Sequence, residues 1–66
     1  MRLSINGEER EFASLRTVSD LVTALELTGK RVAVERNGEI VPRSLHGTAM
    51  LAEGDVLEIV VAVGGG

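Results

Sequence analysis

The last three residues of the sequence are the ones whose type and position could carry chemistry. Gly64, Gly65 and Gly66 directly follow an apolar run and place the α-carboxylate of Gly66 at the terminus. Glycine has no Cβ, so a glycine tail is narrow enough for a channel that other residues would block. At roughly 3.3 Å per residue the tail extends about 10 Å, far enough to carry this carboxylate into a partner's active site. A frayed, solvated terminus is the alternative interpretation.

The other polar residues lack the groupings that catalysis or metal binding requires. The sequence has no cysteine, which excludes disulfides, thiolate nucleophiles and cysteine-based metal sites. Its single histidine, His46, cannot build a metal site alone, and the four serines have no recognisable triad context. We therefore predict no catalytic residue and no metal site, and we expect His46 to be a surface or half-buried polar residue.

Charge and hydropathy exclude several classes of partner. The sequence has 7 basic and 10 acidic residues, a net charge of -3, which disfavours nucleic acids and anionic membranes. No apolar run approaches the roughly 20 residues that span a bilayer. The N-terminus lacks the apolar region of a signal peptide. We expect a cytoplasmic protein that binds no nucleic acid or membrane and is a monomer when free.

The length allows one small domain with an aliphatic core. A chain of 66 residues buries only about 60% of the surface that its unfolded form exposes. Apolar residues make up 44% of the sequence, and Phe12 is the one aromatic residue among them. We predict a domain over residues 1–63 and a flexible glycine tail over residues 64–66.

Two Asn-Gly pairs predict two β-hairpins, because a type I′ turn needs positive φ at both central positions. The first, Asn6-Gly7, joins the alternating strand 1–5 to a charged return strand, 8–12. The second, Asn37-Gly38, joins the apolar strand 32–36 to a short return, 39–41, that Pro42 ends.

A capped amphipathic helix is predicted between the hairpins. Thr17 and Asp20 match a capping box. The apolar residues Val18, Leu21, Val22 and Leu25 then fall at i, i+3, i+4 and i+7, which places them on one helix face. We expect Leu21, Val22 and Leu25 in the core and the helix end near Gly29.

The rest of the sequence predicts a turn region and a central strand. Residues 43–52 are ambiguous and fit a short helical turn pinned to the core by Leu45, Met50 and Leu51. The β-branched run 56–63 is the longest predicted strand and suits the middle of a sheet. Period-2 alternation would leave Val60 and Ala62 exposed beside the tail, as candidate docking positions for a partner.

Together these elements predict an α+β domain with a mixed sheet of about five strands and one main helix on one face. The first and last strands, paired in the middle, run parallel because the helix supplies the crossover. This arrangement is the β-grasp, or ubiquitin-like, architecture.

Several segments resemble the ThiS family of sulfur carrier proteins over the whole length of the chain. They are Ile5-Asn6-Gly7-Glu8, Thr17-Val18, the stretch from Val32 to Arg43, Glu53-Gly54-Asp55 and the terminal Gly65-Gly66. The stretch from Val34 to Arg43 is the most specific of these.

The resemblance implies a mechanism in which the chain is a substrate and not an enzyme. A ThiF-type enzyme would use ATP and Mg²⁺ to adenylate the Gly66 carboxylate, with Gly64 and Gly65 recognised as the tail. Sulfur from cysteine, delivered by a cysteine desulfurase, would convert it to a thiocarboxylate. Thiazole synthase, ThiG, would then take the sulfur into the thiazole ring of thiamine. The chain itself would bind no cofactor.

Two other functions share the terminal diglycine. One is a ubiquitin-like protein modifier, with Gly66 joined to lysines of target proteins. The other is a small subunit of molybdopterin synthase, of the MoaD type. The short length and the stretch from Val34 to Arg43 favour the sulfur carrier.

Overall fold

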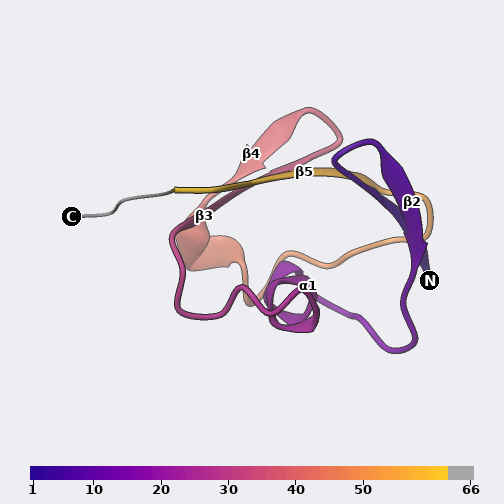
Figure 1. Cartoon of the computed structure of the whole chain (residues 1–66), viewed down its shortest axis with the longest axis horizontal. Helices are drawn as coiled ribbons and strands as arrows, with labels where there is room; N and C mark the ends of the chain where they lie inside the picture. Colours follow the sequence, from indigo (N-terminus) through magenta and orange to yellow (C-terminus); the bar gives the residue numbers. More distant parts are fainter. Residues whose placement is uncertain (63–66) are drawn as a thin grey trace.

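A computed structural model of the chain describes residues 1–62, so the predictions for Val63 and for Gly64, Gly65 and Gly66 lie outside the described residues. One sheet carries one helix on a single face (Figure 1). The elements are β1 (Arg2–Ile5), β2 (Glu8–Glu11), α1 (Val18–Ala24), β3 (Val32–Arg36), β4 (Glu39–Val41), the 3₁₀ turn η1 (Arg43–Leu45) and β5 (Val56–Val61).

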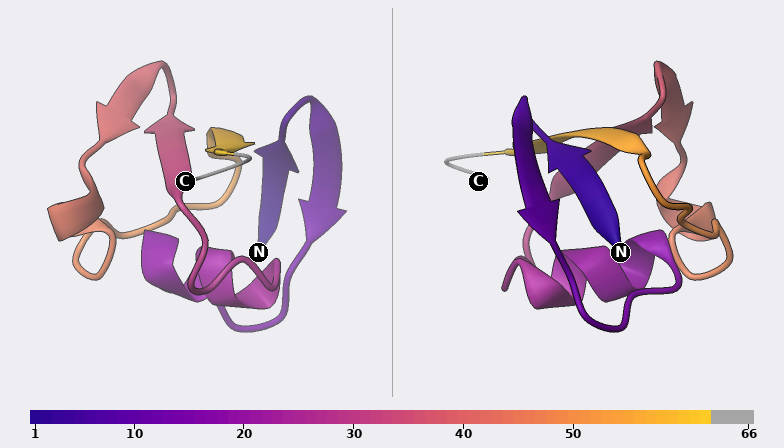
Figure 2. Two further views of the ribbon diagram at one scale, coloured as in Figure 1. Left: turned by 60° about the vertical axis from the view of Figure 1, so that its left-hand side comes forward. Right: turned by 90° about the vertical axis from the view of Figure 1, so that its right-hand side faces the viewer.

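The sheet has the predicted β-grasp topology. Its strand order is β2-β1-β5-β3-β4, with β1 and β5 parallel and the other neighbours antiparallel. The two hairpins flank β5, and α1 lies across one face below them (Figure 2). In register, Ser4 lies opposite Val56 and Ile5 opposite Leu57. The predicted neighbourhood of the first and last strands is confirmed.

Both Asn-Gly turns form as predicted, and their asparagines also hold the central strand. Asn6 and Asn37 each have a φ of 51°, the left-handed conformation that a type I′ turn requires. The Asn6 side chain accepts a hydrogen bond from the Ile59 amide at 2.8 Å and donates to its carbonyl at 3.1 Å. The Asn37 side chain accepts one from the Val56 amide at 2.9 Å. Each turn is therefore also hydrogen-bonded to β5 through its asparagine side chain.

The helix begins as predicted and ends earlier than predicted. Thr17 caps α1 in a complete capping box with Asp20. The helix ends at Ala24, not near Gly29, because Glu26 adopts a left-handed φ of 60°. Two backbone hydrogen bonds form a Schellman motif there. The Glu26 amide donates to the Thr23 carbonyl at 2.9 Å, and the Leu27 amide donates to the Val22 carbonyl at 3.0 Å.

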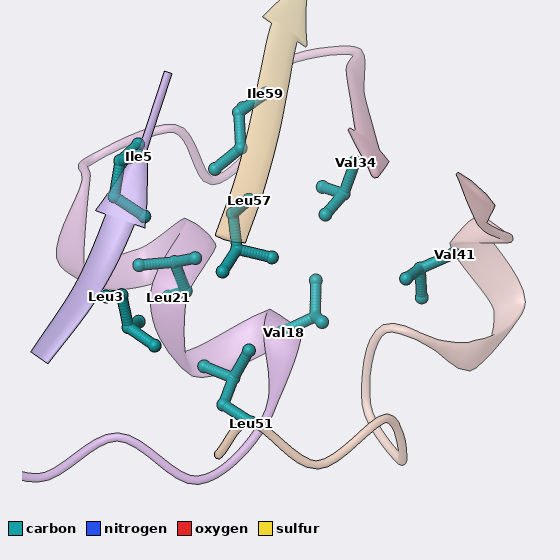
Figure 3. Packing of buried hydrophobic residues seen from close by; sticks show 9 residues of the cluster. All are labelled: Leu3, Ile5, Val18, Leu21, Val34, Val41, Leu51, Leu57 and Ile59. Carbon is teal, nitrogen blue, oxygen red and sulfur yellow. The ribbon is translucent and has the colours of Figure 1, made fainter. Parts of the chain in front are cut away.

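The core lies between α1 and the sheet (Figure 3). Nine aliphatic residues form it: Leu3, Ile5, Val18, Leu21, Val34, Val41, Leu51, Leu57 and Ile59. Of the three helix residues predicted to be core, Leu21 is fully buried, whereas Val22 and Leu25 are half-buried and pack against the cluster.

The segment between η1 and β5 is pinned by fewer side chains than predicted. Leu51 is buried, but Leu45 and Met50 are exposed, which corrects the expectation that all three anchor it. Met50 forms an isolated bridge with Thr17, and in such an extended pairing consecutive side chains point to opposite sides. Leu51 therefore points inward and Met50 outward.

Candidate functional site

The face of the sheet opposite α1 is open, and apolar residues lie on it. Along β5, Leu57 and Ile59 are buried beneath the helix, whereas Val56 and Val60 are 50% and 65% exposed. Ala62, just past the strand, is exposed as well. The alternation predicted for this strand is confirmed, including the exposure of Val60 and Ala62.

A shallow groove of about 380 Å³ surrounds these two exposed residues. Ala33 pairs with Val60 in register and extends the apolar floor. Arg31 and Arg43 also line the groove, and no acidic residue does. The Arg31 carbonyl accepts a hydrogen bond from the Ala62 amide at 2.9 Å, which fixes this arginine beside the end of β5. The groove therefore offers an apolar surface with two cations.

The other half of the open face is charged and internally paired. Arg2 lies 3.5 Å from Glu9 and 3.6 Å from Glu11, all on exposed side chains that contribute little stability. The N-terminal ammonium of Met1 hydrogen-bonds Glu11 and, with its positive charge, holds the pKa of that carboxyl below its usual value. Within residues 1–62, by contrast, Arg31 and Arg43 form no ion pair.

His46 is buried, which corrects the expectation of a surface or half-buried residue. Only 9% of it is exposed, and its Nε2 lies 3.1 Å from the Val41 carbonyl oxygen. The turn η1 folds the chain back beneath β4, so a ring that local sequence would leave in solvent instead satisfies a backbone carbonyl. Within residues 1–62, no hydrogen bond joins its ring to a serine.

Arg36 and Arg43, which flank the second hairpin, differ in their surroundings. Arg43 is exposed, whereas Arg36 is half-buried and donates a hydrogen bond to the Met50 carbonyl. Arg36 is thus structural. Arg31 lines the groove but was not predicted at a site. The signal was its position directly before β3, whose first residue, Val32, pairs with Val61 near the end of β5.

A metal-binding cluster and a membrane-spanning helix are both absent from the part of the chain that the structure describes. Residues 1–62 contain no cluster of three histidine, cysteine or carboxylate side chains that could hold a metal ion. None of their helices is long and apolar enough to cross a membrane. The predicted tail residues Gly64, Gly65 and Gly66 follow Ala62 in the sequence, outside the described residues.

Comparison with known families and structures gives a consistent match. The ThiS family model matches residues 3–66. The sulfur carrier protein ThiS of Bacillus subtilis is 38% identical over 65 residues, covering 97% of this chain and 98% of that protein. The crystal structure of a thiamine biosynthesis protein (ThiS) from Geobacter metallireducens superposes with a TM-score of 0.82 at 30% identity, covering 100% of both chains.

Longer proteins also contain a similar segment. A thiazole synthase of Paramagnetospirillum magneticum is 50% identical over 66 residues, which is all of this chain and 20% of that protein. A thiazole synthase of Magnetococcus marinus is 36% identical over the same length and fraction. The chain thus spans about a fifth of the length of these two relatives.

Proposed function

The chain belongs to the ThiS family, and from this premise we propose that it is a sulfur carrier for the thiazole ring of thiamine. In this function the carrier is a substrate of other enzymes and not a catalyst. Its reactive group is the α-carboxylate of Gly66, with Gly64 and Gly65 as the narrow tail that reaches an active site. Because the reactions use ATP and free cysteine, we place them in the cytoplasm.

The proposed chemistry has three steps. A carboxylate is a poor electrophile, so a ThiF-type enzyme with ATP and Mg²⁺ first converts the Gly66 carboxylate to an acyl adenylate and releases pyrophosphate. Cysteine-derived sulfur, supplied as a persulfide through a desulfurase, then displaces AMP, and a second thiol reduces the resulting acyl disulfide to leave a thiocarboxylate. Thiazole synthase finally takes the sulfur. The chain has no cysteine, so no internal thiol competes for the activated carbonyl.

The observation that carries this proposal is the family match, which extends through the diglycine to residue 66. The described residues are consistent with a carrier. Their one histidine is engaged with a backbone carbonyl, and they contain no cluster of metal ligands. Chemistry at the terminus requires only a stable domain and an accessible surface beside the tail.

The proposed partnership with thiazole synthase is supported by relatives in which a segment like this chain forms a fifth of a thiazole synthase. A carrier and its acceptor enzyme within one polypeptide are held at a high effective concentration. We infer that this chain delivers its sulfur to the same class of enzyme.

The groove beside Val60 and Ala62 is the proposed docking surface for the activating enzyme. Its apolar floor favours a hydrophobic contact, and Arg31 and Arg43 favour an acidic rim on the partner. A partner of that chemistry would hold the domain while the tail enters its active site.

Deletion of Gly66 is the direct test of the reactive group. It should abolish ATP–pyrophosphate exchange with the cognate activating enzyme, because the carboxylate retreats by about 3.3 Å from its attacking position. Gly65→Val should also fail, since a β-branched side chain widens and stiffens the tail. Intact mass of the protein from its own cells should show oxygen replaced by sulfur.

Arg16→Gln is the matched control, because this exposed residue lies outside the groove and should leave exchange at the wild-type rate. Wild-type exchange by the Gly66 deletion would overturn the carrier proposal. Isopeptide conjugates on target lysines would instead indicate a protein modifier, and a stable complex with molybdopterin synthase would indicate a subunit.

Two valines on one face of β5 test the docking surface. Val60→Glu should raise the KM for the carrier in the exchange assay about tenfold or more, because it places a carboxylate on the apolar floor. Val56→Glu introduces the same charge at another exposed valine, which lies outside the groove, and should change KM little. Equal effects of the two variants would contradict this assignment.

A further inference from the structure

A second, smaller cavity lies on the helix side of the sheet, between α1, the loop before β3 and η1. Its volume is about 160 Å³. Drug-sized ligands occupy sites of roughly 300–1,000 Å³, so this cavity suits a small ion or a single functional group. Its polar lining comes from Lys30, Arg43, His46 and the hydroxyls of Ser19, Thr23 and Thr28.

The charge of this lining is opposite to that of the chain. The chain has ten acidic residues and a net charge of -3, yet no acidic residue lines the cavity. Lys30 and Arg43 are exposed and form no ion pair within residues 1–62. Two cations without a carboxylate favour an anionic ligand.

The buried histidine supplies a second, independent observation. A carbonyl oxygen only accepts, so the 3.1 Å contact with Val41 requires that Nε2 of His46 carry a proton. The other ring nitrogen, Nδ1, forms no hydrogen bond within the described residues. It is not among the fully buried atoms that lack a partner, so part of it is accessible. His46 is among the residues that line the cavity.

The remaining wall is held in place by the backbone. The amide of Ser19 donates to the His46 carbonyl at 2.8 Å, which fixes the first turn of α1 against the histidine. The Ser19 hydroxyl lies beside Gly47, 3.9 Å from where a Cβ on that glycine would stand. Ser19 and His46 are thus joined through their backbones, and both line the cavity together with the exposed Lys30 and Arg43.

We propose that this cavity binds a small tetrahedral oxyanion of the sulfate or phosphate type. Lys30 and Arg43 supply the charge, the Ser19 hydroxyl donates a hydrogen bond, and Nδ1 of His46 donates a second one when the ring is protonated. Neutral Nδ1 is an acceptor and opposes an anion, so binding strengthens as the pH falls. Lys30, Arg43 and His46 are the ionisable groups that line the cavity.

Sulfate is the probe, because it remains a dianion at both pH 7.5 and pH 5.5. A titration followed by NMR, at constant ionic strength with chloride as the balancing anion, should give saturable shifts of the His46 ring and the Ser19 amide. The affinity should be higher at pH 5.5 than at pH 7.5. Arg43→Gln and Lys30→Gln should each weaken binding about tenfold, the loss of one charge-assisted contact.

Arg16→Gln removes the same charge from an exposed position outside the cavity and should leave sulfate binding unchanged. Linear, non-saturating shifts, equal losses in Arg16→Gln and Arg43→Gln, or an affinity independent of pH would each overturn the proposal. Inorganic phosphate and glucose 6-phosphate then separate the sources. Binding of both indicates a phosphoryl group of a metabolite, and binding of phosphate alone indicates the free anion.

Discussion

The two faces of the sheet are made by the same strands and have opposite compositions. Beneath the helix, alternate residues of the three inner strands are buried and aliphatic, among them Leu3, Val34 and Leu57. On the open face their neighbours are charged over β1 and β2 and apolar at Ala33 of β3 and the end of β5, with the paired Glu35 and Glu58 between these two regions. Folding explains the first face completely, because burial of each such side chain stabilises the fold by about 1.5–3 kcal/mol.

Folding does not explain the apolar half of the open face. A single exposed valine is ordinary on a protein surface. Val60, Ala62 and Ala33, however, share one groove with two arginines, whereas the neighbouring half of the face carries paired charges. Because nothing in the described fold requires apolar residues there, we attribute them to binding. In the docking proposal, one face serves stability and the other serves recognition.

The largest effect should follow from a change on the covered face. Leu21→Ala removes a fully buried side chain between helix and sheet and should cost about 2–5 kcal/mol of unfolding free energy. In a domain this small that loss approaches the whole stability. Urea denaturation followed by circular dichroism measures it. A loss below about 0.5 kcal/mol, the range of exposed sites, would break the comparison between the faces.

One substitution made on each face sharpens the comparison. Val34→Thr puts a hydroxyl into the core, where it lacks a partner, and should cost about 1–3 kcal/mol. Val60→Thr makes the same isosteric change at a 65% exposed site and should stay within about 0.5 kcal/mol. Both residues are β-branched after the change, so strand propensity cancels. Equal costs in chemical denaturation would show that Val60 is buried in solution.

The smallest expected effect lies at the end of the covering helix. Glu26→Gly should stabilise the domain by about 0.5–1 kcal/mol. The change removes about 1–2 kcal/mol of strain from the left-handed backbone of the folded state. It also raises the conformational entropy of the unfolded chain, which favours unfolding by about 0.4–1 kcal/mol. Glu8→Gly, on the exposed edge strand β2, is the control and should destabilise. A lower midpoint of thermal unfolding for Glu26→Gly would place the helix end elsewhere.

Most of the fold could be predicted because its signals are local. Asn6-Gly7 and Asn37-Gly38 specify their turns through backbone sterics alone, and the capping box at Thr17 and Asp20 specifies the helix start. Alternation along β5 then indicates which residues face the helix. The helix end was mispredicted because the left-handed position that glycine usually fills is taken by Glu26.

The parts that failed depend on contacts between distant segments. His46 is buried because η1 turns it towards the Val41 carbonyl, a consequence of how the chain packs and not of the residues next to it. Arg31 reaches the groove because β3 runs antiparallel to β5. At the candidate site, alternation was enough to predict that Val60 and Ala62 are exposed. The positions of the arginines beside them could be known only from the sheet topology.

The position of β5 in the sheet also has a consequence for translation. The β1–β2 and β3–β4 hairpins have no contact in the sheet except through β5, which emerges from the ribosome after both of them. Until then no strand can join the two hairpins into one sheet. Assembly must therefore wait for residues 56–61 and proceed through contacts between distant segments, which makes folding slow relative to a helical domain of equal size.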